Sequence, residues 1–256
     1  MLENITGYSA SQRIIYNKEA LTNEQSEQLE KAVQRLQDNE PLQYILNNSW
    51  FCGHSFFVNE HVLIPRPETE ELVMWVKESV DESKNIRLLD IGTGSGCIAI
   101  SLEKLLPNAK IFAADNSYKA LQVAQKNAEE LDADVHYIYA DILAENNKAN
   151  LYAPYDVVVS NPPYIAQSEK EFLHKNVLHY EPHNALFVEN ENPFLFYEII
   201  IHFCKKYMQK GGLLFFEINE RFGKEMYFLL ETNSYEDIIL KKDLQGKDRM
   251  IKARLK

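Results

Sequence analysis

Strand-like and helix-like segments alternate along the chain from residue 86 to residue 255. The strand-like segments are short, apolar and rich in β-branched and aromatic residues, which is typical of parallel strands covered by helices on both faces. The last two, 237–244 and 249–255, are joined by a turn that contains Gly246, which predicts a hairpin with an antiparallel strand at the edge. We therefore predict an α/β fold with a mostly parallel, doubly wound sheet. Ligands bind such sheets at the carboxyl ends of the strands, near the point where the strand order reverses.

The N-terminal quarter of the chain has a different pattern. Residues 1–40 are predicted to be helical, with Thr22 or Asn23 at the start of an amphipathic helix that ends before Pro41. Residues 41–64 mix turn residues with aromatic and β-branched ones, which predicts a short hairpin. We therefore expect a small helical N-terminal domain, a hairpin linker and a larger domain, at residues 1–40, 41–64 and 65–256.

Composition limits the classes of function. The net charge is −11 and the lysines are scattered, so we expect no direct binding of nucleic acid. No run approaches the roughly 18 apolar residues of a membrane span, and the N-terminus lacks a basic segment followed by an apolar one. Three cysteines without CxxC spacing favour a reducing compartment, so we expect a cytoplasmic protein with no membrane partner. The seven histidines show no ligand spacing, and we expect no metal.

A glycine-rich turn joins the first strand of the alternating region to its helix, in LLDIGTGSGCIAI at residues 88–100. Gly92, Gly94 and Gly96 would let the backbone approach a ligand and let the helix pack on the strand. A dinucleotide fingerprint needs its third glycine one position later, and Asp90 would repel a pyrophosphate. The same carboxylate suits a cation, such as the ammonium or sulfonium group of S-adenosylmethionine, directly or through water. We predict this cofactor; the alternative is a tight turn with only a structural role.

Two further strands end in an aspartate. Asp115 lies 19 residues beyond Gly96, where a carboxylate can accept both ribose hydroxyls of a cofactor. Its alternative role is to support the start of the helix that Ser117 caps. Asp141 closes the next strand, where the same geometry predicts contact with the adenine amino group and Ile142 would pack on the ring. The alternative for Asp141 is a strand end that contacts no ligand.

The strand at 155–160 ends in Asn161, Pro162, Pro163 and Tyr164. The prolines restrict the backbone, so the Asn161 side-chain oxygen and the Pro162 carbonyl can face one point as two hydrogen-bond acceptors. A planar NH₂ group fits between them, with Tyr164 against its flat face. Amide nitrogens are poor nucleophiles because their lone pair is delocalised, so positioning and electrostatic stabilisation would promote the reaction. We predict that Asn161, Pro162 and Tyr164 are catalytic and that these three, with Pro163, bind the substrate.

The pairing of D-x-G-x-G-x-G with N-P-P-Y resembles the class I S-adenosylmethionine-dependent methyltransferases that act on amide or ring-amino nitrogens. Further segments narrow this to the peptide chain release factor glutamine methyltransferases, the PrmC/HemK family: PLQYI at 41–45, VLIPRPETEELV at 62–73, Glu181 with Pro182, and DLQGKDRMI at 243–251. The resemblance implies a Rossmann-like methyltransferase domain after a small helical domain and a hairpin linker. It also implies methylation of the side-chain amide nitrogen, N5, of the glutamine in the Gly-Gly-Gln motif of release factors, the proteins of translation termination.

The same resemblance assigns site residues by position. Asn161 would contact the cofactor as well as the substrate, and Arg66 and Thr69 would lie near the cofactor. The predicted cofactor set is Arg66, Thr69, Asp90, Gly92, Thr93, Gly94, Ser95, Gly96, Asp115, Asp141, Ile142 and Asn161.

Three other functions fit parts of this pattern. A glutamine methyltransferase of a ribosomal protein would share N-P-P-Y. A methyltransferase of nucleic-acid amino groups, such as adenine N6, would hold a base in the same pocket, although the net charge of −11 and the lack of a basic insertion disfavour it. A protein that binds S-adenosylmethionine without activity would not need Asn161 and Tyr164.

Overall fold

The computed structural model describes residues 1–144, 151, 154–190 and 192–256. Within these residues the main feature is a seven-stranded sheet in the order β10-β11-β9-β6-β3-β4-β5. Strands β3, β4, β5, β6 and β9 all run in the same direction, which confirms the mostly parallel, Rossmann-like sheet. Their bounds are β3 Arg87–Ile91, β4 Lys110–Asp115, β5 Val135–Tyr139, β6 Tyr155–Ser160, β9 Met208–Glu217, β10 Tyr235–Lys242 and β11 Asp248–Leu255.

The single strand that runs against the others in this sheet, as far as the chain is described, is β11. It pairs antiparallel with both β9 and β10, so it lies one place in from the edge. The edge strand β10 therefore pairs antiparallel with its neighbour, which confirms the predicted antiparallel edge, whereas the inner place of β11 was not predicted. The connection through α11 (Gly223–Thr232) carries the chain from β9 past one vacant place to β10. The hairpin then returns β11 into that place, which leaves β10 as the edge.

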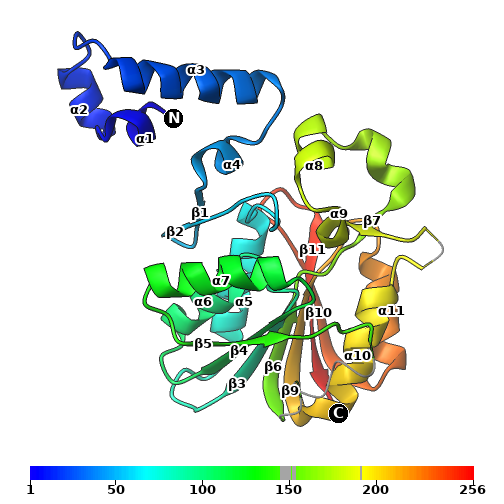
Figure 1. Ribbon diagram of the computed structural model, residues 1–256. Coiled ribbons are helices and arrows are strands. Elements are labelled where there is room, and N and C mark those ends of the chain that lie inside the picture. The colour runs from blue at the N-terminus through cyan, green and yellow to red at the C-terminus, as the bar shows by residue number, and fades with distance from the viewer. Residues whose placement is uncertain (145–150, 152–153, 191) are drawn as a thin grey trace.

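Helices cover both faces of the sheet (Figure 1). On one face lie α5 (Pro67–Ser79), α6 (Cys97–Leu105) and α7 (Tyr118–Glu130), and on the other α10 (Leu195–Tyr207) and α11. Alternate residues of each central strand enter the two cores. Leu88, Val157 and Phe215 pack in the core under α5 and α6, whereas Leu89, Val158 and Phe216 pack in the core under α10. Burial on both faces explains why these strands are continuously apolar.

The N-terminal helices lie apart from the sheet, at the top of Figure 1. They are α1 (Leu2–Thr6), α2 (Ala10–Ile15) and α3 (Asn23–Gln37), and the Thr22 side chain caps α3 in a capping box with Gln25. Helix α4 (Leu42–Leu46) follows and was not predicted. The predicted hairpin is present as β1 (Ser49–Phe51) and β2 (His54–Phe56).

A folded segment follows β6 that the sequence did not predict. It contains β7 (Ile165–Ala166), a 3₁₀ helix (Gln167–Phe172), α8 (Lys175–Tyr180), α9 (His183–Leu186) and β8 (Phe187–Val188). Strands β7 and β8 pair in parallel. The Tyr180 hydroxyl donates to the carbonyl of Asp38 (2.9 Å), so this segment contacts the end of the N-terminal helices.

The strand order reverses at β3, because β4 lies on one side of it and β6 on the other. In open α/β sheets a crevice forms outside the carboxyl ends of the strands at this point. Among the described residues, no helix is both long and apolar enough to cross a membrane.

Candidate active site

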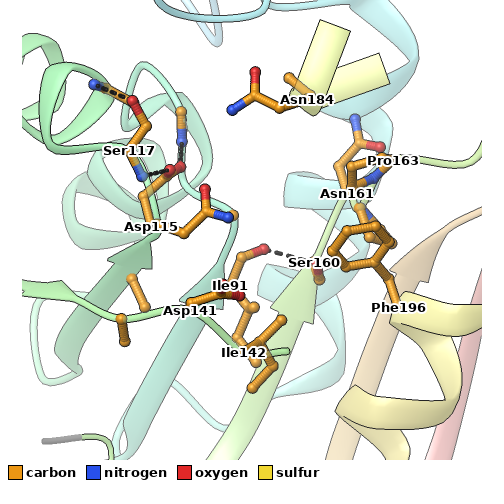
Figure 2. A pocket seen from close by; sticks show the side chains of 18 of the residues that line it. Ile91, Asp115, Ser117, Asp141, Ile142, Ser160, Asn161, Pro163, Asn184 and Phe196 are labelled. Atoms are coloured by element: carbon orange, nitrogen blue, oxygen red, sulfur yellow. Dashed lines mark hydrogen bonds between the residues drawn. The ribbon is translucent and has the colours of Figure 1, made fainter. Parts of the chain in front are cut away.

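The central pocket lies at the carboxyl ends of β3, β4 and β6, at the reversal point (Figure 2). Asp115 and Asn161 lie on opposite sides of it, with Asp141 and Ile142 between and below them in this view. The described residues that line it are His61, Val62, Leu63, Ile91, Gly92, Gly94, Ala114, Asp115, Asn116, Ser117, Ala120, Ala140, Asp141, Ile142, Leu151, Ser160, Asn161, Pro162, Pro163, Asn184, Ala185, Phe196 and Ile200.

The three glycines of the turn have two different roles. All have positive φ, at 77°, 56° and 80° for Gly92, Gly94 and Gly96. A Cβ built on Gly92 or Gly94 meets nothing within 4 Å, and both residues line the central pocket. A Cβ on Gly96 would lie 3.1 Å from the Cβ of Ala124. The first two glycines therefore leave space for a ligand, whereas the third lets α6 pack against α7.

Asp90 lies behind the turn rather than on the pocket wall. It is fully buried, and the Thr93 hydroxyl donates to its Oδ2 (2.6 Å), while Oδ1 has no partner among the described residues. Burial raises the pKa of the Asp90 carboxyl to about 7. Thr93, Ser95 and Gly96 are likewise absent from the pocket lining. Contact of these four residues with a cofactor stays a prediction.

Asp115 faces the central pocket from the end of β4. Its Oδ2 accepts from the backbone N–H of Gly94 (2.9 Å) and its Oδ1 from that of Ser117 (2.8 Å). The N-cap of α7 is the hydroxyl of Ser117, which accepts from the N–H of Ala120 (3.2 Å). Burial raises the pKa of the Asp115 carboxyl, although these backbone N–H groups oppose the shift. Each carboxylate oxygen keeps a lone pair for a further donor, which is the arrangement that a pair of hydroxyls needs.

The wall beyond Asp115 is largely apolar. Ala114, Ile142 and Leu151 are buried and belong to the core cluster under α10. Asp141 also lines the pocket, and its Oδ1 accepts from the N–H of Leu143 (2.9 Å), which holds the turn after β5. An apolar wall with one carboxylate at its rim suits a flat aromatic ring that carries an amino group.

The Asn161–Tyr164 loop stands between the central pocket and a side pocket. The side pocket is lined by Leu63, Arg66, Asn161, Pro162, Tyr164, Ile165, Leu173, Val177, Ala185, Leu186 and Glu217. Asn161 and Pro162 line both pockets. The strand before them is tied to β3, because the Ser160 hydroxyl donates to the carbonyl of Ile91 (2.7 Å; Figure 2).

Buried acidic residues support the side pocket. Glu217, at the end of β9, accepts from the hydroxyls of Thr69 (2.6 Å) and Tyr164 (3.1 Å). Glu181 accepts from the N–H of Ile64 (3.1 Å) and forms an ion pair with Arg66. Burial raises the pKa of the Glu217 carboxyl. The pKa of the Tyr164 hydroxyl is also raised, mainly by burial and in addition by the nearby negative charge of Glu217.

Several of these residues were missed as site residues. Glu217, Asn184 and Phe196 line the two pockets and were not predicted to do so. Glu217 carried a usable signal, because it closes an apolar strand in the same way as Asp115. Neither Arg66 nor Thr69 lines the central pocket. Arg66 lines the side pocket, and Thr69 donates a hydrogen bond to Glu217, which lines it. Nowhere in the described chain do three histidine, cysteine or acidic side chains gather as metal ligands would.

The fold, with its pocket at the strand ends, is that of a class I methyltransferase, and a family model described as Methyltransferase small domain matches residues 72–187. A second model, described as PrmC N-terminal domain, matches residues 1–46 and so includes α4, beyond the predicted boundary at residue 40. The chain belongs to the release factor glutamine methyltransferase family. The family predicted from the motifs is confirmed.

Relatives and a solved structure support these statements. The release factor glutamine methyltransferase of Flavobacterium psychrophilum is 50% identical over 236 residues, 91% of this chain and 82% of that protein. That of Bacteroides thetaiotaomicron is 49% identical over 227 residues, 88% and 80% of the two chains. The 16S rRNA N2 G1207 methyltransferase (RsmC) of Thermus thermophilus, solved with AdoMet and guanosine, aligns with a TM-score of 0.56 and 16% identity over 82% of this chain and 50% of that one. This last likeness is one of fold.

Proposed function

We propose that this protein transfers the methyl group of S-adenosylmethionine to the side-chain amide nitrogen of the glutamine in the Gly-Gly-Gln motif of peptide chain release factors, in the cytoplasm. The observation that carries the proposal is the position of Asn161 and Pro162, which line both pockets. A cofactor in the central pocket and a glutamine in the side pocket would meet at these two residues.

The residues of the central pocket fit S-adenosylmethionine. Asp115 has free lone pairs for the ribose hydroxyls, Ile142 offers an apolar surface to the adenine ring, and Asp141 lies at the rim for its amino group. The backbone at Gly92 and Gly94 has the open space that the methionine part needs. The bound cofactor supplies an electrophilic methyl group on a sulfonium.

The chain's own contribution to the reaction is positioning. The side-chain oxygen of Asn161 and the carbonyl of Pro162 accept the two N–H bonds of the glutamine amide and orient its nitrogen toward the central pocket. Two acceptors on these hydrogens also increase the electron density at nitrogen, which partly offsets the delocalisation of its lone pair. Tyr164, held by Glu217, contributes its ring to the side-pocket wall.

The domain organisation follows the same proposal. We assign residues 65–256 to catalysis, residues 41–64 to a linker and residues 1–40 to a small helical domain that helps engage the release factor. The contact of Tyr180 with Asp38 joins the segment around the side pocket to these N-terminal helices. Release factor bound at one would therefore lie near the other.

The test is transfer of labelled methyl from S-adenosylmethionine to a recombinant release factor. Its Gln→Ala variant in the Gly-Gly-Gln motif, ribosomal proteins, bulk DNA and bulk RNA serve as parallel acceptors. We expect label on the intact release factor alone. Label on a ribosomal protein or on nucleic acid, with none on the release factor, would overturn the proposed substrate.

A further inference from the structure

We propose that Thr69 and Glu217 are positioning residues, which fix the Asn161 amide with its oxygen toward the substrate and its nitrogen away from it. This inference rests on the proposed function, in which that oxygen accepts a hydrogen of the glutamine amide. The three side chains come from different elements: Thr69 from the first turn of α5, Asn161 from the loop after β6, and Glu217 from the end of β9.

A chain of hydrogen bonds joins them. Nδ2 of Asn161 donates to the hydroxyl of Thr69 (3.3 Å), and that hydroxyl donates to Oε2 of Glu217 (2.6 Å). Thr69 and Glu217 are 3% and 2% exposed, so water does not compete freely for these bonds. The other carboxylate oxygen, Oε1, accepts from Tyr164 (3.1 Å). One carboxylate therefore anchors both ends of the loop from Asn161 to Tyr164.

The direction of these bonds determines which way the Asn161 amide faces. A threonine hydroxyl has a single hydrogen, and an ionised carboxylate can only accept. Because Thr69 gives its hydrogen to Glu217, it can only accept from Asn161. The group that faces Thr69 must then be Nδ2, and Oδ1 is left for the pockets that Asn161 lines.

The alternative orientation would be unproductive. The oxygen and nitrogen of an asparagine side chain have nearly the same shape, so only the hydrogen-bond network distinguishes them. A flipped Asn161 would present N–H bonds to the N–H bonds of the substrate amide, which repel. Without Thr69 and Glu217, part of the enzyme would hold this flipped form, and turnover would fall although Asp115 and the apolar wall of the cofactor pocket are unchanged.

Thr69→Val is the main test, because valine keeps the shape and removes the hydroxyl. We expect kcat for release factor methylation to fall about tenfold to a hundredfold, somewhat less than the about 10²–10³ for loss of a direct electrostatic contact. The Kd of S-adenosylmethionine should not change, and Thr69→Ser should restore most of the activity. Glu217→Gln should also lower kcat, because the glutamine side-chain amide can donate to the Thr69 hydroxyl and so permit the flipped form of Asn161.

A double-mutant cycle separates positioning from general destabilisation. If Thr69 acts through Asn161, Thr69→Val should slow the Asn161→Ala enzyme no further. The side-chain amide resonance of Asn161 in ¹⁵N-labelled protein, identified by its loss in Asn161→Ala, should shift in Thr69→Val without any substrate. Tyr235→Phe is the control: it removes a buried hydroxyl that donates to the Ile201 carbonyl (3.3 Å) away from both pockets, and kcat should stay at the wild-type value.

The outcomes are distinguishable. Wild-type kcat in both Thr69→Val and Glu217→Gln, or full additivity with Asn161→Ala, would overturn the positioning role while the proposed function stands. Failure of the wild-type enzyme to methylate the release factor would instead overturn the proposed function.

Discussion

The side chain of Asn127, on α7, bonds both backbone polar groups of Phe57, 70 residues earlier in the chain. The N–H of Phe57 donates to Oδ1 of Asn127 (2.6 Å), and Nδ2 of Asn127 donates to the Phe57 carbonyl (3.0 Å). The same Nδ2 also donates to the carbonyl of Ser95 in the glycine-rich turn (2.8 Å). A single buried amide thus joins the hairpin linker to the turn beside the central pocket.

Asn127→Ala should therefore lower the free energy of unfolding by about 2–4 kcal/mol, because it leaves the buried carbonyl of Ser95 and the part-buried N–H and carbonyl of Phe57 without this partner. Chemical denaturation of the variant measures this loss. Asn108→Ala is the matched control, since the Asn108 side chain bonds one exposed carbonyl, that of Glu82 (2.9 Å). Equal effects of the two substitutions would contradict the role of Asn127.

Asn161→Ala should reduce turnover by about 10²–10³, the effect of losing one preorganised electrostatic contact. The affinity for S-adenosylmethionine should change little, because Asp115 and the apolar wall remain. Steady-state methylation of the release factor and cofactor calorimetry measure the two quantities. Near-normal turnover would remove Asn161 from the mechanism.

Asp115→Ala should weaken binding of S-adenosylmethionine by about 1–3 kcal/mol, if buried ribose hydroxyls lose their acceptor. Calorimetry gives the affinity directly. Asp156→Ala serves as the control, because Asp156 also accepts from a backbone N–H, that of Arg87 (2.8 Å), but at the amino end of the strands. An unchanged affinity in Asp115→Ala would place the ribose elsewhere.

Gly96→Ala should destabilise the protein more than Gly53→Ala. Both glycines have φ near 80°, at 80° and 79°, so the backbone strain of an alanine is similar. A Cβ at position 53 meets nothing within 4 Å, whereas one at position 96 approaches Ile100 at 3.0 Å. Overpacking of this kind costs about 1–3 kcal/mol, which denaturation of the two variants should resolve as a difference.

Asp90→Asn should change how stability depends on pH. Burial raises the pKa of Asp90 from the ordinary 3.8 to about 7, so between these values the unfolded chain binds fewer protons than the folded one. Stability from this group is complete below about pH 4 and is lost as the pH rises to about 7. Asparagine is neutral throughout, so the stability of the variant relative to wild type should rise over this range, by at most about 4 kcal/mol. Urea unfolding at pH 4.5, 6 and 8 tests this, and a constant difference would show that Asp90 is already ionised.

Local patterns predicted the parts of the fold that depend on neighbouring residues. The helix cap, predicted at Thr22 or Asn23 and found at Thr22, the cap at Ser117 and the apolar strand that ends at Ser160 each follow from a few adjacent residues. The Asn161–Tyr164 loop was predicted as a candidate site from the same kind of local pattern, because its chemistry lies in consecutive residues. Its position between two pockets is consistent with that prediction.

The features that were missed depend on distant contacts. The inner place of β11 depends on its pairing with β9, which lies far from it in sequence. The sequence pattern of the hairpin would be the same if β11 were at the edge and β10 inside. Helices α8 and α9 are short, at 6 and 4 residues, and helices of this length are too short to be stable from their own sequence. The contact of Glu217 with Thr69 depends on the position of β9 in the sheet, which no local pattern around Glu217 shows.

That bond has a consequence for how the protein acquires its site. Thr69 and Glu217 are 148 residues apart in sequence, Asn161 and Thr69 are 92 apart, and Ile64 and Glu181 are 117 apart. Contacts of such long range form only after the entropy of closing the intervening loops has been lost, which delays them in folding. The side pocket should thus be completed late, when β9 has joined the sheet. Methyl transfer to the release factor by any variant would accordingly report that β9 has taken its place beside β6.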